Sequence, residues 1–109
     1  MEPVVVIGAG PQGLAAAAHL RERGLEPLVL EAGDGPGAAV AEWGHVRLFS
    51  AWPELIDTAA RRALDRTGWA VPEKGYPTGR QWVDTYLAPL AEALGDRVRY
   101  GSRVVGVGR

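Results

Sequence analysis

Hydrophobic residues near the start of the chain form two short runs on either side of an alanine-rich stretch. Residues 3–7 are apolar without polar alternation, which is typical of a strand buried on both faces of a parallel sheet. The stretch 11–23 predicts a helix lying close to the sheet, and Gly24 stands where a C-cap glycine belongs. Residues 27–31 predict a second strand, which a right-handed crossover places parallel to the first. The pattern therefore predicts a βαβ unit.

The middle of the chain changes from glycine-rich to amphipathic. Residues 32–46 contain several glycines and predict a loop that is long enough to carry a function, with a short extended piece at 46–49. Residues 53–67 place their apolar positions on one stripe and predict a helix, which Gly68 ends. A second loop is expected before the next helix.

The last part of the chain predicts one longer helix and two late strands. Thr78 is expected to cap a helix over residues 79–94, and Pro89 to kink or divide it. Residues 98–100 and 103–107 predict short strands. The second of these is apolar and has no later segment to pair with, and exposed edges of this kind are usually covered. We therefore expect either a longer protein, of which this is the N-terminal part, or a partner chain.

Two tryptophans differ in the surroundings that the pattern predicts for them. Trp82 shares a helix face with Tyr86, so we expect it in the core, whereas Trp43 falls in the glycine-rich loop. Trp43 could therefore offer its ring to a ligand.

Composition excludes several classes of function. With 109 residues, the chain is one domain or part of one, and its net charge of −1 gives no reason to expect nucleic acid or an anionic membrane as a partner. It has no cysteine, which excludes disulfides and thiol chemistry within these residues, and its two histidines have no acidic pattern that indicates a metal site. No apolar run approaches the roughly 20 residues that cross a bilayer, so a cytoplasmic location is expected.

The glycines between the first strand and the first helix are spaced as in a phosphate-binding turn. Gly8 permits a tight turn out of the strand, Gly10 lets a diphosphate approach the backbone, and Gly13 lets the helix pack near the strand. Pro11 gives up only an N–H group that has no partner within the helix. The remaining N–H groups and the helix dipole favour an anion.

Glu31 ends the second predicted strand. Because neighbouring parallel strands end at the same edge of the sheet, its carboxylate should lie beside the glycine turn and accept hydrogen bonds from ribose hydroxyls. The same charge would repel a 2′-phosphate, which argues against NADP in this site. Together the turn and the acid predict a dinucleotide site in an α/β, Rossmann-like fold with a small parallel sheet.

The stretch from Gly8 to Ala17, together with Gly24 and Glu31-Ala32-Gly33-Asp34, resembles the opening of FAD-dependent oxidoreductases with two dinucleotide-binding domains, including the flavin monooxygenases. The resemblance implies that residues 1–109 are the N-terminal, incomplete part of an FAD-binding domain. It places the FAD diphosphate and ribose on a set of residues that comprises Gly8, Gly10, Pro11, Gln12, Gly13, Glu31 and Ala32.

The same resemblance implies further cofactor contacts. Trp43 and Arg47 lie in the segment that passes the flavin, and the backbone of Val104 falls where adenine is met. The disulfide reductases of this superfamily place a cysteine pair after the acid-bearing loop, so the absence of cysteine argues against that branch. The second nucleotide motif, for NAD(P)H, would lie beyond Arg109.

Three functions remain open from the sequence. The first is the FAD-binding portion of an oxidoreductase that uses NAD(P)H and acts on a small-molecule substrate in a monooxygenase-like reaction. The second is the NAD-binding domain of a dehydrogenase, and the third is a nucleotide-binding module without catalysis. The long loop and late strands after Glu31, in place of regular βα units, favour FAD. The sequence indicates no catalytic acid or base.

Overall fold

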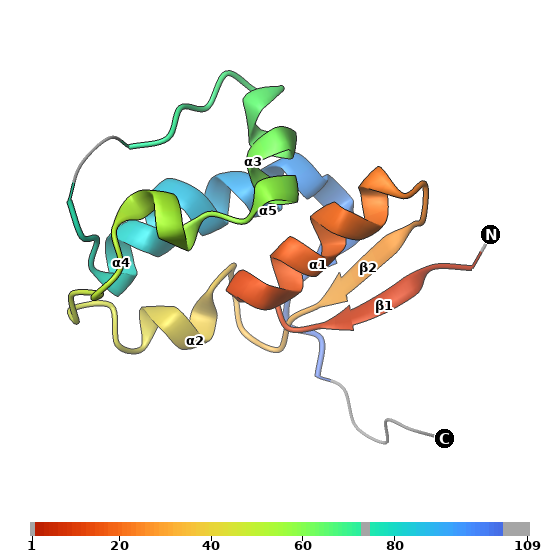
Figure 1. Ribbon diagram of the computed structural model, residues 1–109. Coiled ribbons are helices and arrows are strands. Elements are labelled where there is room, and N and C mark those ends of the chain that lie inside the picture. The colour runs from red at the N-terminus through yellow and green to blue at the C-terminus, as the bar shows by residue number, and fades with distance from the viewer. Residues whose placement is uncertain (1, 73–74, 104–109) are drawn as a thin grey trace.

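A computed structural model describes residues 2–72 and 75–103 and places them in an α/β arrangement (Figure 1). Strands β1 (Val4–Ile7), β2 (Pro27–Leu30) and β3 (Val98–Arg99) form one sheet in that order, and both neighbouring pairs are parallel. Val6 pairs with Val29, and Val29 pairs with Val98. The three strands therefore end at the same edge of the sheet, where helix α1 begins (Figure 1).

Helix α1 (Pro11–Glu22) connects β1 to β2 and confirms the predicted βαβ unit. Its buried residues are Leu14, Ala17 and Ala18, and two of these are small enough to let the helix lie close to its neighbours. Gly24 follows the helix with a φ of +76°, which confirms the predicted C-cap glycine.

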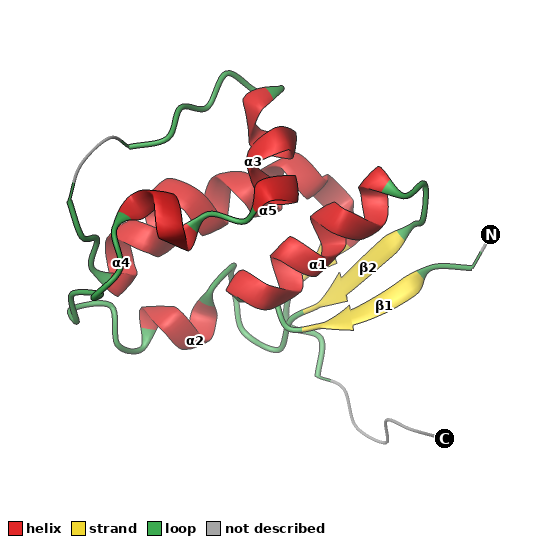
Figure 2. Cartoon of the chain, viewed as in Figure 1, coloured by secondary structure: helices red, strands yellow, loops and turns green. Residues whose placement is uncertain are grey.

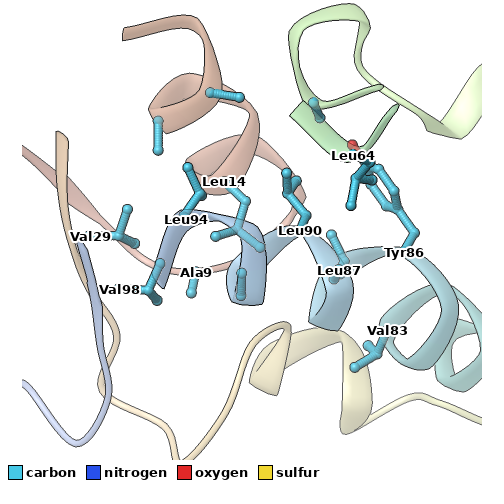
Figure 3. Close-up of a cluster of buried hydrophobic side chains, with 14 of the residues drawn as sticks. Ala9, Leu14, Val29, Leu64, Val83, Tyr86, Leu87, Leu90, Leu94 and Val98 are labelled. Atoms are coloured by element: carbon cyan, nitrogen blue, oxygen red, sulfur yellow. The ribbon is translucent and has the colours of Figure 1, made fainter. Parts of the chain in front are cut away.

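The second layer of helices packs against α1. It consists of α3 (Thr58–Asp65), α4 (Gly79–Trp82), the π-helical turn η2 (Val83–Leu87) and α5 (Ala88–Leu94), followed by the short turn η3 (Gly95–Arg97). Figure 2 shows these helices grouped to one side of the strands. The core brings strand and helix residues together: Figure 3 shows Leu14 and Leu94 near Val29 and Val98, and Leu64 near Tyr86, within one buried cluster.

The predicted helix over residues 79–94 is present, with Pro89 inside it. Thr78 caps it as expected: its hydroxyl accepts the Gln81 N–H at 3.1 Å, and the Gln81 side chain accepts the Thr78 N–H at 2.9 Å. Pro89 removes one helical N–H, and η2 lies directly before it. The wider π-helical turn accommodates the proline without ending the helix.

Two predicted elements differ from the structure. The helix expected over residues 53–67 is divided into a 3-10 turn, η1 (Trp52–Leu55), and α3, because Ile56 and Asp57 adopt extended backbone conformations. Asp57 then caps α3 by accepting the Ala60 N–H at 2.9 Å. The predicted loop at 32–46 contains a short helix, α2 (Ala38–Ala41).

Strand β1 is not buried on both faces, which corrects the prediction made from its apolar run. Val5 is 52% exposed and Ile7 is 56% exposed, whereas Val6 packs against the core. Among the described residues, β1 has a single neighbouring strand, and the helices cover only the face of the sheet to which Val6 belongs.

Strand β3 confirms the first of the two late strands, although it is shorter than predicted. The strand expected at 103–107 falls almost entirely outside the described residues, as does Val104. Within residues 2–72 and 75–103, every helix is too short or too polar to span a bilayer.

Candidate functional site

The glycine turn after β1 has the geometry that its sequence predicts. Gly8 has a φ of +97°, a conformation that favours glycine, and its N–H donates to the Leu30 carbonyl at 2.8 Å. A Cβ atom on Gly13 would lie 1.9 Å from the Gly8 carbonyl oxygen, so α1 can start this close to the strand only with glycine there. A Cβ atom on Gly10 would meet nothing within 4 Å. The space over Gly10 is therefore open to a ligand.

The start of α1 presents backbone donors to that space. The N–H groups of Gly10, Gln12 and Gly13 have no hydrogen-bond acceptor among the residues that the structure describes. Gly10 is the N-cap residue, and Pro11 fills the first helical position, where no N–H is needed. The helix therefore directs unpaired donors and the positive end of its dipole to one place, which is suited to an anion.

Glu31 reaches the turn, as the parallel strands predict, and it also holds the turn in place. One carboxylate oxygen accepts the Ala9 N–H at 2.7 Å, and the other accepts the Gly33 N–H at 2.8 Å. The Ala9 carbonyl in turn accepts the Gly37 N–H at 2.8 Å. Because each carboxylate oxygen has a second lone pair, Glu31 can still accept a hydrogen bond from a hydroxyl group of a ligand. Its role as a brace for the turn was not predicted from the sequence.

A cavity of about 670 Å³ joins the turn, Glu31 and the segment that follows β2. This volume is within the range of small-molecule sites. Its lining includes most of the predicted cofactor residues, namely Gly8, Gly10, Pro11, Gln12, Gly13, Glu31 and Trp43. The structure therefore brings together residues that are more than 30 positions apart in the chain.

Part of the cavity wall is apolar and aromatic. It is formed by α2, Leu55 and Glu54, and by the tryptophans Trp43 and Trp82. The ring of Trp43 packs on Gly79, where a Cβ atom would lie 2.8 Å from it, and the Trp82 indole N–H donates to the Leu55 carbonyl at 3.3 Å. Trp82 is partly buried and packs against the core, as the sequence predicts, and it also borders the cavity.

The contributions of α2 and Glu54 to the cavity wall were also missed. The only sequence signal for α2 is the run Ala38–Ala41, which has neither glycine nor proline, inside a glycine-rich segment. Glu54 is placed by η1, and its carboxylate accepts the Ala51 N–H at 3.1 Å.

The remaining predicted residues do not line this cavity. Ala32 is exposed next to Glu31. Arg47 pairs with Thr78 in an antiparallel bridge, donates its guanidinium to the Tyr76 carbonyl, and lines a separate hollow of about 350 Å³. The bridge matches the extended piece predicted at 46–49, but it directs Arg47 away from the glycine turn. Val104 lies outside the described residues, so the cofactor roles of these three residues stay predictions.

Tyr100 is a further residue at this edge that the sequence did not single out. It directly follows β3 and is 38% exposed. Burial raises the pKa of its hydroxyl, and the charge of Glu31 raises that pKa further.

Comparison with known families identifies the domain. The family model described as an NAD(P)-binding Rossmann-like domain matches residues 6–67, which is more than half of the chain. This chain belongs to the NAD(P)-binding Rossmann-like domain family. The match covers the end of β1, the glycine turn, α1, β2 and Glu31, as well as α2 and α3.

Similar proteins are longer than this member of the family. Indole-3-pyruvate monooxygenase YUCCA1 of Oryza sativa is 35% identical over 102 residues, which is 92% of this chain and 23% of the relative. The bacillithiol disulfide reductase of Bacillus cereus matches with a TM-score of 0.72 and 29% identity over 92% of this chain and 28% of that one. A FAD-bound form of OTEMO matches with a TM-score of 0.61 and 25% identity, over 92% and 19% of the two chains. The chain therefore spans about a quarter of the length of the curated relative.

Proposed function

We propose that this Rossmann-like domain binds FAD and is the N-terminal FAD-binding portion of a flavin-dependent oxidoreductase. One observation carries the proposal: the unpaired amides at the start of α1 and the carboxylate of Glu31 border the same cavity. An anion-binding helix start next to a strand-end acid suits the diphosphate and ribose of an adenine dinucleotide.

The aromatic end of the cavity favours FAD over NAD. Trp43 and Trp82 line the same cavity as the glycine turn, and a flat ring system could lie against an indole there. After Glu31 the chain forms α2 to α5 before it returns to the sheet at β3, and these are not the regular βα units of a simple dehydrogenase. The FAD-bound structure that shares this fold supports the same choice.

The reaction that best fits the relatives is monooxygenase-like and uses NAD(P)H with a small-molecule substrate. The plant relative, a monooxygenase, supports this class. Bound FAD would supply the hydride and electron-transfer chemistry. The described residues would bind and orient the cofactor: the amides of Gly10, Gln12 and Gly13 would hold the diphosphate, and Glu31 the ribose.

A disulfide reductase is the second candidate, because the structure of such an enzyme matches this chain with a TM-score of 0.72. This chain contains no cysteine that could take part in thiol exchange. For either activity, we propose that further protein, either more of the same chain or a partner chain, completes the enzyme, and that it acts in the cytoplasm.

Titration of the purified protein with FAD and with NAD, followed by calorimetry, tests the proposal. We expect the wild-type protein to bind FAD and Gly10→Val to abolish binding, because the valine side chain fills the space that the diphosphate needs. Gly35→Val is the matched control, since a Cβ atom on Gly35 also meets nothing within 4 Å and Gly35 does not line the cavity. Binding of NAD without FAD would favour a dehydrogenase, and retention of FAD by Gly10→Val would contradict the assignment of the turn.

A further inference from the structure

The ends of the three strands form a row along one edge of the sheet. The glycine turn follows β1, Glu31 follows β2, and Tyr100 follows β3. Neighbouring strands lie about 4.8 Å apart, so the three segments that follow them are near one another. The parts of an ADP moiety have the same order: diphosphate, ribose and adenine.

The backbone fixes Tyr100 beside Glu31. The Glu31 N–H donates to the Arg99 carbonyl at 2.9 Å, and the Ser102 N–H donates to the Glu31 carbonyl at 2.8 Å. Both residues that flank the pair Tyr100-Gly101 are therefore bonded to Glu31. The Gly101 N–H also donates to the Gly33 carbonyl at 2.9 Å. Tyr100 is thus held by a continuation of the sheet.

The side chain of Tyr100 is available to a ligand on this edge. It is 38% exposed, and its only side-chain polar atom, the phenol oxygen, has no hydrogen-bond partner among the described residues. Leu30 pairs with Arg99 in the parallel register of β2 and β3, so Glu31 and Tyr100 are the next residues along the two neighbouring segments.

We infer that Tyr100 forms the adenine-binding wall of the site, with its ring stacked on the base of the ADP moiety whose ribose Glu31 holds. The inference rests on the proposed function. It adds Tyr100, which follows the third strand, to a site whose adenine contact the resemblance placed at Val104. Stacking selects a large flat base, so Tyr100 would make the site prefer a purine diphosphate to a pyrimidine diphosphate.

Calorimetric titration of the whole chain with ADP and with UDP tests the inference. The two probes share the ribose and the diphosphate and differ only in the base. We expect the wild type to prefer ADP, and Tyr100→Ala to weaken ADP binding between about 5-fold and 150-fold, which is the range for the loss of one stacked base. Tyr100→Phe keeps the ring and should bind ADP as the wild type does. Tyr76→Ala is the matched control, because Tyr76 is 51% exposed and lines the separate hollow that contains Arg47.

The ratio of the ADP and UDP affinities separates stacking from a structural effect. If Tyr100 stacks on the base, Tyr100→Ala lowers the preference for ADP over UDP. If its role is structural, the substitution weakens the binding of both ligands equally and leaves this preference unchanged. Tyr100→Leu, which keeps an apolar side chain but has no aromatic face, provides the same measurement if the alanine variant does not fold. An unchanged ratio, with ADP still bound, would overturn the role of Tyr100 and leave the proposed function intact. Failure of the wild type to bind either FAD or ADP would overturn both.

Discussion

The carboxylate of Glu31 ties two backbone amides together and also faces the cavity. Its bonds to Ala9 and Gly33 connect the turn after β1 to the turn after β2, so the site has its shape independently of any ligand. A site that is already formed loses less conformational entropy when it binds. Glu31 therefore contributes to binding in two ways: it contacts the ligand, and it holds the site in its binding conformation.

Replacing Glu31 should weaken nucleotide binding through the loss of both contributions. We expect Glu31→Ala to weaken ADP binding by about 1–3 kcal/mol, the range for hydrogen bonds to a charged group. Glu31→Gln keeps one carbonyl acceptor without the charge and should lose less. Calorimetric titration of the three proteins measures the difference. An ADP affinity that is the same in Glu31→Ala and wild type would refute the ribose role.

Substitutions at Gly13 and at Gly10 should differ in their effect on the stability of the fold. Gly13→Ala places a methyl group 1.9 Å from the Gly8 carbonyl oxygen, so we expect a loss of about 1–3 kcal/mol in the free energy of unfolding. Gly10→Ala meets no protein atom within 4 Å and should unfold within about 1 kcal/mol of the wild type. Urea denaturation of both variants tests this contrast. Equal stability of the two would mean that α1 can move away from β1 freely.

The sequence predicted the glycine turn and Glu31 because backbone rules fix their positions. A turn between a strand and a helix needs glycine at defined places, and parallel strands end together. It did not predict the hollow that contains Arg47, because no periodicity determines where one side chain of a long loop points. The brace formed by Glu31 could not be predicted either, since its partners are backbone groups that any sequence supplies.

At the level of elements, capping interactions by single side chains decide where helices begin. The break between η1 and α3 occurs at Asp57, whose side chain caps α3 and accepts a hydrogen bond from the Ala60 amide. The other carboxylate oxygen lies 2.9 Å from the His19 ring, which joins α3 to α1. The apolar stripe alone predicted one helix, because a stripe cannot show where a cap interrupts it.

Removal of the cap should destabilise the domain. We expect Asp57→Ala to lower the free energy of unfolding by about 0.5–2 kcal/mol. Asp57→Asn retains a side-chain oxygen for the Ala60 amide and should lose less. Chemical denaturation near neutral pH compares the variants with the wild type. If the asparagine variant is as unstable as the alanine variant, the contact with His19 and not the cap is the larger contribution.

Tyr86 in η2 should make the domain sensitive to alkali. Burial raises the pKa of its hydroxyl, and only 1% of the residue is exposed. Below a pH of about 10 both the folded and the unfolded chain keep this proton, so the stabilising effect is fully present. Above that pH the unfolded chain releases the proton while the folded chain retains it, so the free energy of unfolding falls.

Urea denaturation from about pH 8 to pH 11 measures this fall. Tyr86→Phe has no proton to release at that position, so its stability should depend less on pH in the upper part of the range. It also lacks the hydroxyl that accepts the Asp57 N–H at 3.2 Å, and should be less stable at the lower end. Parallel pH profiles of the two proteins would contradict the role of Tyr86.

At the scale of the whole molecule, the sheet is open where its sequence predicts burial. The apolar run in β1 is typical of a strand covered on both faces, yet the helices cover one face, and Val5 and Ile7 are exposed on β1. The sequence pattern therefore correctly predicted an apolar strand but could not show what covers each of its faces. The chain spans 23% of the length of its plant relative.

An open edge with apolar side chains should lead to self-association of the isolated chain. We expect the apparent mass of the wild type to rise with concentration in sedimentation experiments. Val5→Lys places a charge on the exposed face and should reduce this rise without lowering the thermal stability. Ser102→Lys, a charge added after β3 and so away from the open edge at β1, is the matched control. A wild type that stays monomeric at every concentration would contradict the prediction.

The two indoles on the cavity wall have an optical consequence. Tryptophan emits light in the range where oxidised flavins absorb, and Trp43 and Trp82 both border the same cavity. A flavin in that cavity would quench the fluorescence of both by resonance energy transfer. The other two tryptophans lie elsewhere: Trp52 lines the hollow that contains Arg47, and Trp69 packs against Tyr86 at a ring distance of 6.1 Å. The natural emission of the domain would therefore report how full the cavity is, without any added dye.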